Sequence, residues 1–317
     1  MLYVKCDMKI VFWGSSEFAV LALQALPKAG FSVNLVVTQP DAPKGRFLRL
    51  EACPVAKTAK ELGFPLFQPE RLKLEETLAR IKEAGADLFV VAAYGRIIPE
   101  NILNLAFRGT INIHPSLLPK YRGPSPIQSA ILNGETETGA SIMLLDKEMD
   151  HGPLLAQKTV SIQPATTAPK LEQILSILGA ELLVATLPRY LAGEIQPVPQ
   201  DHTKATICKM LTREDGKINW PEPAEVIERK IRAFEPWPGT YTHFGSPEKS
   251  ELLKILKATV VAGKNEPGLI GRDGTIGTGQ DLLKLELVQP AGKNPMAFRD
   301  FLRGHQQLVD TRFFKLN

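Results

Sequence analysis

The sequence predicts an α/β protein, with a mostly parallel sheet followed by a second, smaller β-barrel domain. Apolar β-rich runs alternate with amphipathic helical runs through the first two thirds of the chain, a pattern typical of strand–helix–strand units. The last third instead contains short β-like segments separated by turn residues. The length of 317 residues exceeds what one ordinary core supports, so two domains are expected.

Hydrophobic periodicity assigns the elements of the first domain in order. An apolar strand over 9–14 leads into a helix over 15–30, whose spacing is helical and whose end is marked by Gly30. Further strands are expected over 32–39, 87–94, 109–116, 138–146 and 153–162. Further helices are expected over 54–63, 71–85, 99–106 and 125–135, with a long helix over 167–193 that closes the domain.

A change of composition marks the second domain. The segment 194–209 is polar and contains two prolines, so we interpret it as a linker between a catalytic domain at 8–193 and a C-terminal domain at 210–317. After the linker we expect a helix over 224–234 and another over 296–304, with β-like segments between them at 240–244, 252–262, 268–279 and 281–290.

Composition limits the compartment and the partners. The three cysteines form no CxxC pair, which predicts neither a disulfide framework nor a structural metal site and favours the reducing cytoplasm. No stretch approaches the roughly 18 apolar residues of a membrane helix, and the N-terminus lacks a signal-peptide pattern. We therefore expect no membrane association, and we expect Met1–Asp7 to be an extension ahead of the first strand. The net charge of +4, most of it after Ala205, is compatible with an anionic partner.

The stretch "GTINIHPSLLP" places a histidine at the end of an apolar strand. Asn112 and His114 alternate with Ile111 and Ile113, so the two polar side chains share one face of the strand. Parallel sheets bind ligands at the carboxyl ends of their strands. An amide donor and an imidazole in this place predict a catalytic or binding site, with the rigid "PSLLP" holding the backbone beside it.

Two further segments carry candidate groups. Asp150 in "MDHGP" can orient a histidine and stabilise its imidazolium form, although the adjacent His151 is an equal candidate for the working histidine. Lys120 and Arg122 would add a basic flank.

The first loop, "GSSEF", lacks the glycines of a dinucleotide-binding motif, which disfavours a nicotinamide cofactor.

The segment "TQPDAPKGRFLR" follows the second expected strand. Its prolines and glycine predict a loop, and Lys44, Arg46 and Arg49 make that loop basic. One interpretation is an arm that contacts phosphates. The other is an exposed turn with ordinary surface charge.

Taken together, these segments resemble the methionyl-tRNA formyltransferase family. The motifs "TQPDAPKGR", "VVAAYGRIIP", "INIHPSLLPKYRGPSPIQ", "ETGASIMLLDKEMDHGP" and "RAFEPWPG" occur in that family's order and spacing, from Met8 past Pro290. "HPSLLP" and "MDHGP" alone are similar to the wider class of folate-dependent formyltransferases and hydrolases. The basic loop and "AFEPWPG" narrow the resemblance to the tRNA enzymes.

The resemblance implies an activity and the residues that carry it. It implies formyl transfer from 10-formyltetrahydrofolate, the folate donor, to initiator methionyl-tRNA for translation initiation, without a metal and by a monomer. Asn112, His114 and Asp150 match the family's catalytic trio. The family's folate-binding turn matches Ser116, Leu117, Leu118 and Pro119. Arg46, with Lys44 and Arg49 beside it, matches the loop that contacts the tRNA acceptor stem. The N-terminal domain matches the family's Rossmann-like sheet, which binds the folate donor, and the C-terminal domain matches the OB-like β-barrel that helps to hold the tRNA.

Two alternatives remain at this stage. A sugar-nucleotide N-formyltransferase would share the trio but would not need a basic, extended loop at 38–49. A tRNA- or folate-binding module without turnover would not need an intact trio of Asn112, His114 and Asp150.

Overall fold

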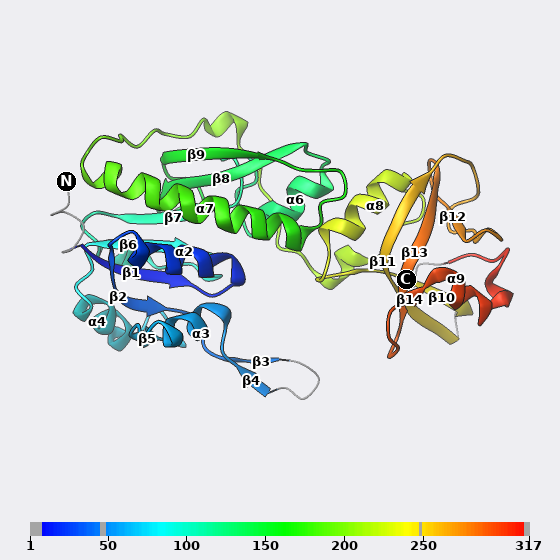
Figure 1. Ribbon diagram of the computed structural model, residues 1–317, viewed down its shortest axis with the longest axis horizontal. Coiled ribbons are helices and arrows are strands. Elements are labelled where there is room, and N and C mark those ends of the chain that lie inside the picture. Colours follow the sequence, from blue (N-terminus) through cyan, green and yellow to red (C-terminus); the bar gives the residue numbers. More distant parts are fainter. Residues whose placement is uncertain (1–7, 45–48, 247–248, 314–317) are drawn as a thin grey trace. The chain divides into compact units, whose positions relative to one another are not determined.

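A computed structural model describes residues 8–44, 49–246 and 249–313. These residues form two compact units (Figure 1). Unit 1 comprises the described residues up to Pro126, together with Glu137–Ser161 and Glu172–Lys209. Unit 2 comprises Ile127–Thr136, Ile162–Leu171 and the described residues from Met210 onward. Met1–Asp7, which the sequence analysis treats as an extension, lie outside the described residues.

Unit 1 is built on a seven-stranded sheet of order β5-β2-β1-β6-β7-β8-β9. The first five strands of this order run parallel. Near the other edge, β8 pairs antiparallel with both of its neighbours, β7 and β9. A parallel-rich sheet confirms the predicted α/β class. The strands are β1 (Lys9–Gly14), β2 (Ser32–Val37), β5 (Leu66–Phe67), β6 (Leu88–Ala92), β7 (Thr110–His114), β8 (Glu137–Leu144) and β9 (Leu154–Ser161).

The strand order reverses between β1 and β6. From β1 the chain proceeds outward through β2 to β5, and it then returns to β6 and continues through β7 in the other direction. Such a reversal leaves a crevice at the carboxyl ends of the strands, where proteins of this architecture bind ligands. All five residues of β6 and of β7 are buried, so these two strands form the middle of the unit 1 core.

Helices cover both faces of this sheet: α2 (Glu17–Lys28), α3 (Pro54–Glu61), α4 (Glu75–Glu83), α5 (Glu100–Leu103) and α7 (Ala168–Leu191). On one face, Ile81 of α4 and Ile102 of α5 pack in a cluster with Val91 of β6. On the other face, α7 crosses β7 (Figure 1). A methyl group added at Gly179 would lie 2.7 Å from Cγ2 of Ile113, so this glycine allows the helix to approach the strand closely.

The helix α7 is long and apolar enough to cross a membrane, judged by length and composition alone. The expectation that no stretch approaches such a helix was therefore wrong. Within unit 1 this helix belongs to the core: Gly179 lies against Ile113, and the Ser176 hydroxyl donates a hydrogen bond to the Phe18 carbonyl of α2 at 2.8 Å. Packing on a sheet accounts for the apolar composition of this part of α7.

The segment expected to be a basic loop contains a two-stranded ribbon. β3 (Ala42–Lys44) pairs antiparallel with β4 (Arg49–Glu51), with Lys44 opposite Arg49. Figure 1 shows both strands extending away from the seven-stranded sheet. The prediction of an irregular loop was wrong for these strands, because pairing across the ribbon overrides the turn-forming composition of "QPDAPKG".

Unit 2 contains a curled antiparallel sheet of order β10-β11-β13-β12, with β14 paired to β13. Its core includes five aromatic side chains, those of Trp220, Phe244, Phe298, Phe301 and Phe313. The curled sheet agrees with the small β-rich class predicted for the C-terminal part. Its elements are α6 (Pro126–Leu132), η2 (Arg213–Gly216), α8 (Ala224–Ala233), β10 (Thr240–Ser246), β11 (Lys249–Val261), β12 (Thr275–Gly277), β13 (Leu282–Pro290), β14 (Met296–Ala297), α9 (Phe298–Arg303) and η3 (Gln306–Leu308).

One expected strand of unit 2 is much shorter than its sequence pattern. Within 268–279 only Thr275–Gly277 forms a strand. The Asp273 carboxylate accepts hydrogen bonds from the Thr275 backbone N–H at 3.1 Å and from its hydroxyl at 2.7 Å. This local turn competes with strand pairing and delays the start of β12.

Candidate functional site

Two polar side chains end the central strand β7. Asn112 is 8% exposed and His114 is 4% exposed. The parallel register with β6 sets Asn112 beside Val91, so Asn112 lies on the face that α4 and α5 cover, whereas Ile113 lies against α7. His114, two residues further along, shares the face of Asn112. The strand therefore brings these two side chains together at its carboxyl end, as the alternation predicts.

The carboxylate of Asp150 lies beside both groups, although it is 38 residues after Asn112 in the chain. Its Oδ1 is 3.5 Å from Asn112 Nδ2 and 3.6 Å from His114 Nδ1. Its Oδ2 accepts a hydrogen bond from the backbone N–H of Gly123 at 2.8 Å. The contacts to Asn112 and His114 are longer than ordinary hydrogen bonds. Contacts of this kind tighten when a substrate completes a catalytic site.

The hydrogen bond of His114 to the backbone defines which ring nitrogen carries the hydrogen. Nε2 of His114 lies 2.9 Å from the carbonyl oxygen of Tyr121. A carbonyl oxygen only accepts, so Nε2 carries the hydrogen and donates it. In the neutral ring Nδ1 is then unprotonated, and it faces the Asp150 carboxylate. Nδ1 is thus the ring atom through which His114 meets the carboxylate, at 3.6 Å.

The turn after β7 is held by internal hydrogen bonds. The Ser116 hydroxyl donates to the Lys120 carbonyl at 2.6 Å, and the Ser141 hydroxyl donates to the Ser116 carbonyl at 2.6 Å. Ser141 also accepts from the Leu118 N–H at 3.1 Å, and Gln157 Nε2 donates to the Leu118 carbonyl at 2.8 Å. Four hydrogen bonds among residues of three separate segments therefore hold this turn.

The four residues expected to bind folate differ in how much of each is exposed to solvent. The side chains of Ser116 and Leu118 are 0% and 3% exposed, and they support the turn from inside. Leu117 and Pro119 are partly exposed. A ligand on this turn would therefore contact Leu117, Pro119 and the backbone, rather than the Ser116 hydroxyl.

The following segment differs from its expected role as a basic flank. Lys120 is exposed, but Arg122 is only 9% exposed and points into hydrogen bonds with Gln200. Interpreting Arg122 as part of a surface flank was wrong, because its guanidinium is bound inside unit 1. Sequence reasoning also missed Gln200, which donates to the backbone carbonyl of Asp150 at 3.0 Å.

His151, the alternative working histidine, has different partners. Its Nδ1 lies 2.7 Å from Asp146 Oδ2, and its ring stacks on His202 with a centroid distance of 4.1 Å. It is His114, not His151, that the structure places next to the Asp150 carboxylate. The geometry therefore favours His114 as the histidine of the site.

Two of the three basic residues expected to contact phosphates belong to the β3–β4 ribbon. Lys44 ends β3 and Arg49 begins β4, so the far end of the ribbon carries two basic residues. Arg46 lies outside the described residues. A ribbon presents such residues on a regular backbone rather than on an irregular turn.

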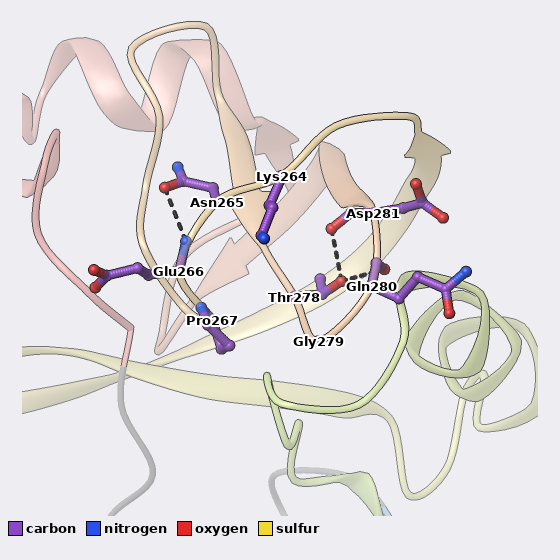
Figure 2. Close-up of a pocket in the computed structure, with 8 residues that line it drawn as sticks. All are labelled: Lys264, Asn265, Glu266, Pro267, Thr278, Gly279, Gln280 and Asp281. Atoms are coloured by element: carbon purple, nitrogen blue, oxygen red, sulfur yellow. Dashed lines mark hydrogen bonds between the residues drawn. The ribbon is translucent and has the colours of Figure 1, made fainter.

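In the part of the chain that the structure describes, no group of three or more histidine, cysteine, aspartate or glutamate side chains is placed to hold a metal ion. A pocket of about 410 Å³ lies in unit 2, between the loops 264–267 and 278–281 (Figure 2). Charged residues of both signs line it, and the Thr278 hydroxyl there donates to the backbone of its own loop. None of the candidate site residues lines this pocket.

Two family models, one for each part of the chain, identify the class of protein as a formyl transferase. The family model described as "Formyl transferase" matches residues 8–187, and that of the "Formyl transferase, C-terminal domain" matches residues 210–306. The chain belongs to the methionyl-tRNA formyltransferase family, since curated members of that family match almost its whole length.

The methionyl-tRNA formyltransferase of Chloroflexus aurantiacus is 48% identical, over 94% of this chain and 97% of its own length. That of Thermodesulfovibrio yellowstonii is 42% identical, over 94% and 96%. Among solved structures, HypX from Aquifex aeolicus in complex with tetrahydrofolic acid has a TM-score of 0.64 at 17% identity, covering 98% of this chain and 50% of that one. The N-formyltransferase from Helicobacter canadensis, in complex with folinic acid and dTDP-3-aminofucose, has a TM-score of 0.62 at 20% identity, covering 88% and 99%. These two structures share the fold.

Proposed function

We propose that the chain transfers the formyl group of 10-formyltetrahydrofolate to the amino group of methionine on initiator methionyl-tRNA, for translation initiation. The observation that carries the proposal is the Asp150 carboxylate beside both Asn112 and His114 at the carboxyl end of β7. The names of the relatives over nearly the full length of both chains support the substrates.

The reaction forms a bond between the methionyl nitrogen and the formyl carbon and breaks the bond from that carbon to a folate nitrogen. The attacking amine loses a proton, and the leaving nitrogen gains one. Negative charge develops on the formyl oxygen as the amine attacks. A preorganised donor at that oxygen is typically worth a factor of about 10² to 10³ in rate. The amide of Asn112 has two N–H groups, of which its contact with Asp150 uses one, so the other is available for this role.

His114 and Asp150 would handle the proton. The Nε2–H of His114 is committed to the Tyr121 carbonyl, so Nδ1 is the atom that accepts a proton, directly or through a water. Asp150 lies 3.6 Å from Nδ1, and Gly123 holds the other carboxylate oxygen. The carboxylate thus stabilises the imidazolium in the place where it forms.

The rigid turn after β7 would hold the donor. When bound, 10-formyltetrahydrofolate supplies a formyl carbon that its folate nitrogen already activates. Leu117 and Pro119 offer partly exposed apolar surface for it, on a turn fixed from inside by Ser116 and Leu118. Apolar surface of this kind would contact the ring portion of the donor.

The basic ribbon and the C-terminal domain would hold the tRNA. Lys44, Arg46 and Arg49 offer positive charge to acceptor-stem phosphates. We further propose that the catalytic domain is 8–193, the linker 194–209 and the tRNA-binding domain 210–317, and that the enzyme acts as a cytoplasmic monomer.

We expect the Arg46→Ala variant to raise the KM for tRNA about tenfold at low salt, with little change in the Kd for the folate donor. A contact with a phosphate releases counterions, so the loss should shrink as the salt concentration rises. Steady-state kinetics over a series of salt concentrations measures this effect. The control is Arg80→Ala, which removes an exposed arginine paired with Glu83 on α4. Equal losses for both substrates, or a loss independent of salt, would contradict a phosphate contact.

The function is tested by incubating the purified protein with formyl-labelled donor and one of three acceptors. These are charged initiator tRNA, charged elongator methionyl-tRNA and an amino-sugar nucleotide. We expect label on the methionyl amine of the initiator tRNA. Absence of label would refute the proposal, and faster labelling of the sugar nucleotide would assign the chain to sugar N-formylation. Binding of donor and tRNA without any transfer would indicate a module without turnover.

A further inference from the structure

The side chain of Gln200 spans the space between Asp150 and Arg122. Gln200 lies in the polar segment that follows α7, yet it is only 5% exposed. We propose that Gln200 is a positioning residue for formyl transfer, which acts by holding the backbone of Asp150 so that its carboxylate lies between Asn112 and His114. This inference rests on the function proposed above and assigns a further residue to it.

All four hydrogen-bonding positions of the Gln200 amide are used. Nε2 donates to the carbonyl oxygen of Asp150 at 3.0 Å and to that of Gly152 at 2.8 Å. Oε1 accepts from Arg122 Nε at 3.1 Å and from Arg122 Nη2 at 2.8 Å. An amide has two donors and two acceptor positions, so a single orientation of the Gln200 amide makes all four of these hydrogen bonds. A buried network that is fully satisfied has a unique geometry.

The backbone that Gln200 holds is not in a relaxed conformation. Asp150 has a φ of +50°, in the left-handed region that residues other than glycine rarely adopt. Such conformations persist only where the surroundings over-determine them. The two bonds from Gln200 bracket the Asp150–Gly152 turn at both ends and supply that constraint.

Arg122 links Gln200 to the backbone segment that contacts both Asp150 and His114. Its neighbour Gly123 donates to the Asp150 carboxylate, and its neighbour Tyr121 accepts from His114. The Arg122 guanidinium donates to Gln200, which in turn holds the Asp150 turn. The segment 121–123 is therefore linked to that turn both through the Arg122 side chain and through the Gly123 backbone.

The segment that carries Gln200 also lies along 119–123. Thr206 accepts from the Arg122 N–H at 2.9 Å through its carbonyl and from the Tyr121 N–H at 2.8 Å through its hydroxyl. The Cys208 N–H donates to the Arg122 carbonyl at 2.8 Å. The proposed linker 194–209 is thus grouped with unit 1 and packs along the segment that contacts His114 and Asp150.

The test is Gln200→Glu, which keeps the size of the side chain and its pairing with Arg122 but replaces the donors that face Asp150 and Gly152 with an oxygen. Displacement of a catalytic group by about 1 Å costs on the order of 10²-fold in rate. We expect kcat to fall by about 10- to 100-fold, with the KM for both substrates within about threefold of the wild-type value. The matched control is Gln196→Glu in the same segment, where an exposed side chain donates to the Gly193 carbonyl; it should change neither parameter.

A double-mutant cycle separates positioning from a general loss of stability. If Gln200 acts through Asp150, the double variant Asp150→Asn with Gln200→Glu should have a kcat within about threefold of Asp150→Asn alone. Multiplied losses, a rise in KM in place of the fall in kcat, or an unchanged kcat would overturn the proposal. Donor binding and a thermal melt show whether each variant is folded. Gln200→Met removes the polar contacts without adding charge and should show the same fall in kcat. Its kcat is the one compared if the glutamate variant does not fold. The wild-type protein runs in the same assay, so a failure of the proposed function is seen separately as absence of transfer by the wild type.

Discussion

Asp150→Asn is expected to lower kcat for formyl transfer by about 10²- to 10⁴-fold while leaving the KM for both substrates nearly unchanged. The amide oxygen can keep the bond from the Gly123 N–H, so the turn retains its geometry. The amide N–H then faces His114 Nδ1 and donates to it, because Nε2 is already committed to the Tyr121 carbonyl. The ring is held neutral, and the amine proton loses its acceptor.

The measurement is the single-turnover rate of formyl transfer, alongside donor binding. Asp146→Asn is a matched control, because Asp146 also faces a histidine, namely His151 at 2.7 Å, outside the trio. The control should transfer formyl within about threefold of the wild-type rate. An Asp146→Asn loss as large as that of Asp150→Asn would show that His151 is the working histidine.

Asn112→Ala is expected to lower kcat by about 10²- to 10³-fold, since it removes a preorganised donor at the oxygen where negative charge develops. The effect should appear in the chemical step and not in substrate binding, because the bond is strongest in the transition state. Rapid-quench kinetics isolates that step. Asn104→Ala, at the exposed end of α5, provides a control that should not change the rate. A loss confined to the Kd for the donor would assign Asn112 to binding instead.

Local pattern predicted most of the unit 1 sheet, because buried parallel strands are continuous apolar runs between helices. Local pattern failed for short strands whose formation depends on pairing with a neighbouring strand. β5 is only two residues long, and β3 and β4 form from a proline-rich stretch that has the composition of a loop. The apolar run of α7 was recognised as a helix, but its length and composition also fit a membrane span, and only its packing against β7 shows its place in the core of unit 1.

The candidate site divides in the same way. Period-two alternation brought Asn112 and His114 together, since both belong to one strand. Spacing alone left His114 and His151 as equal candidates for the working histidine, and the structure separates them by their partners. Gln200 gave no sequence signal, because a single polar residue in a polar segment has no period. Its place depends on contacts across long separations, such as that between Tyr121 and Thr206, 85 residues apart.

The most direct test of the central claim, that formyl transfer takes place at the Asn112–His114–Asp150 group, is a single-turnover experiment with His114→Ala. Donor, charged initiator tRNA and excess enzyme are mixed, and the Kd for the donor is measured in parallel. The result we predict is a loss of about 10²- to 10⁴-fold in the transfer rate with an unchanged Kd. Transfer by His114→Ala at the wild-type rate would contradict the account.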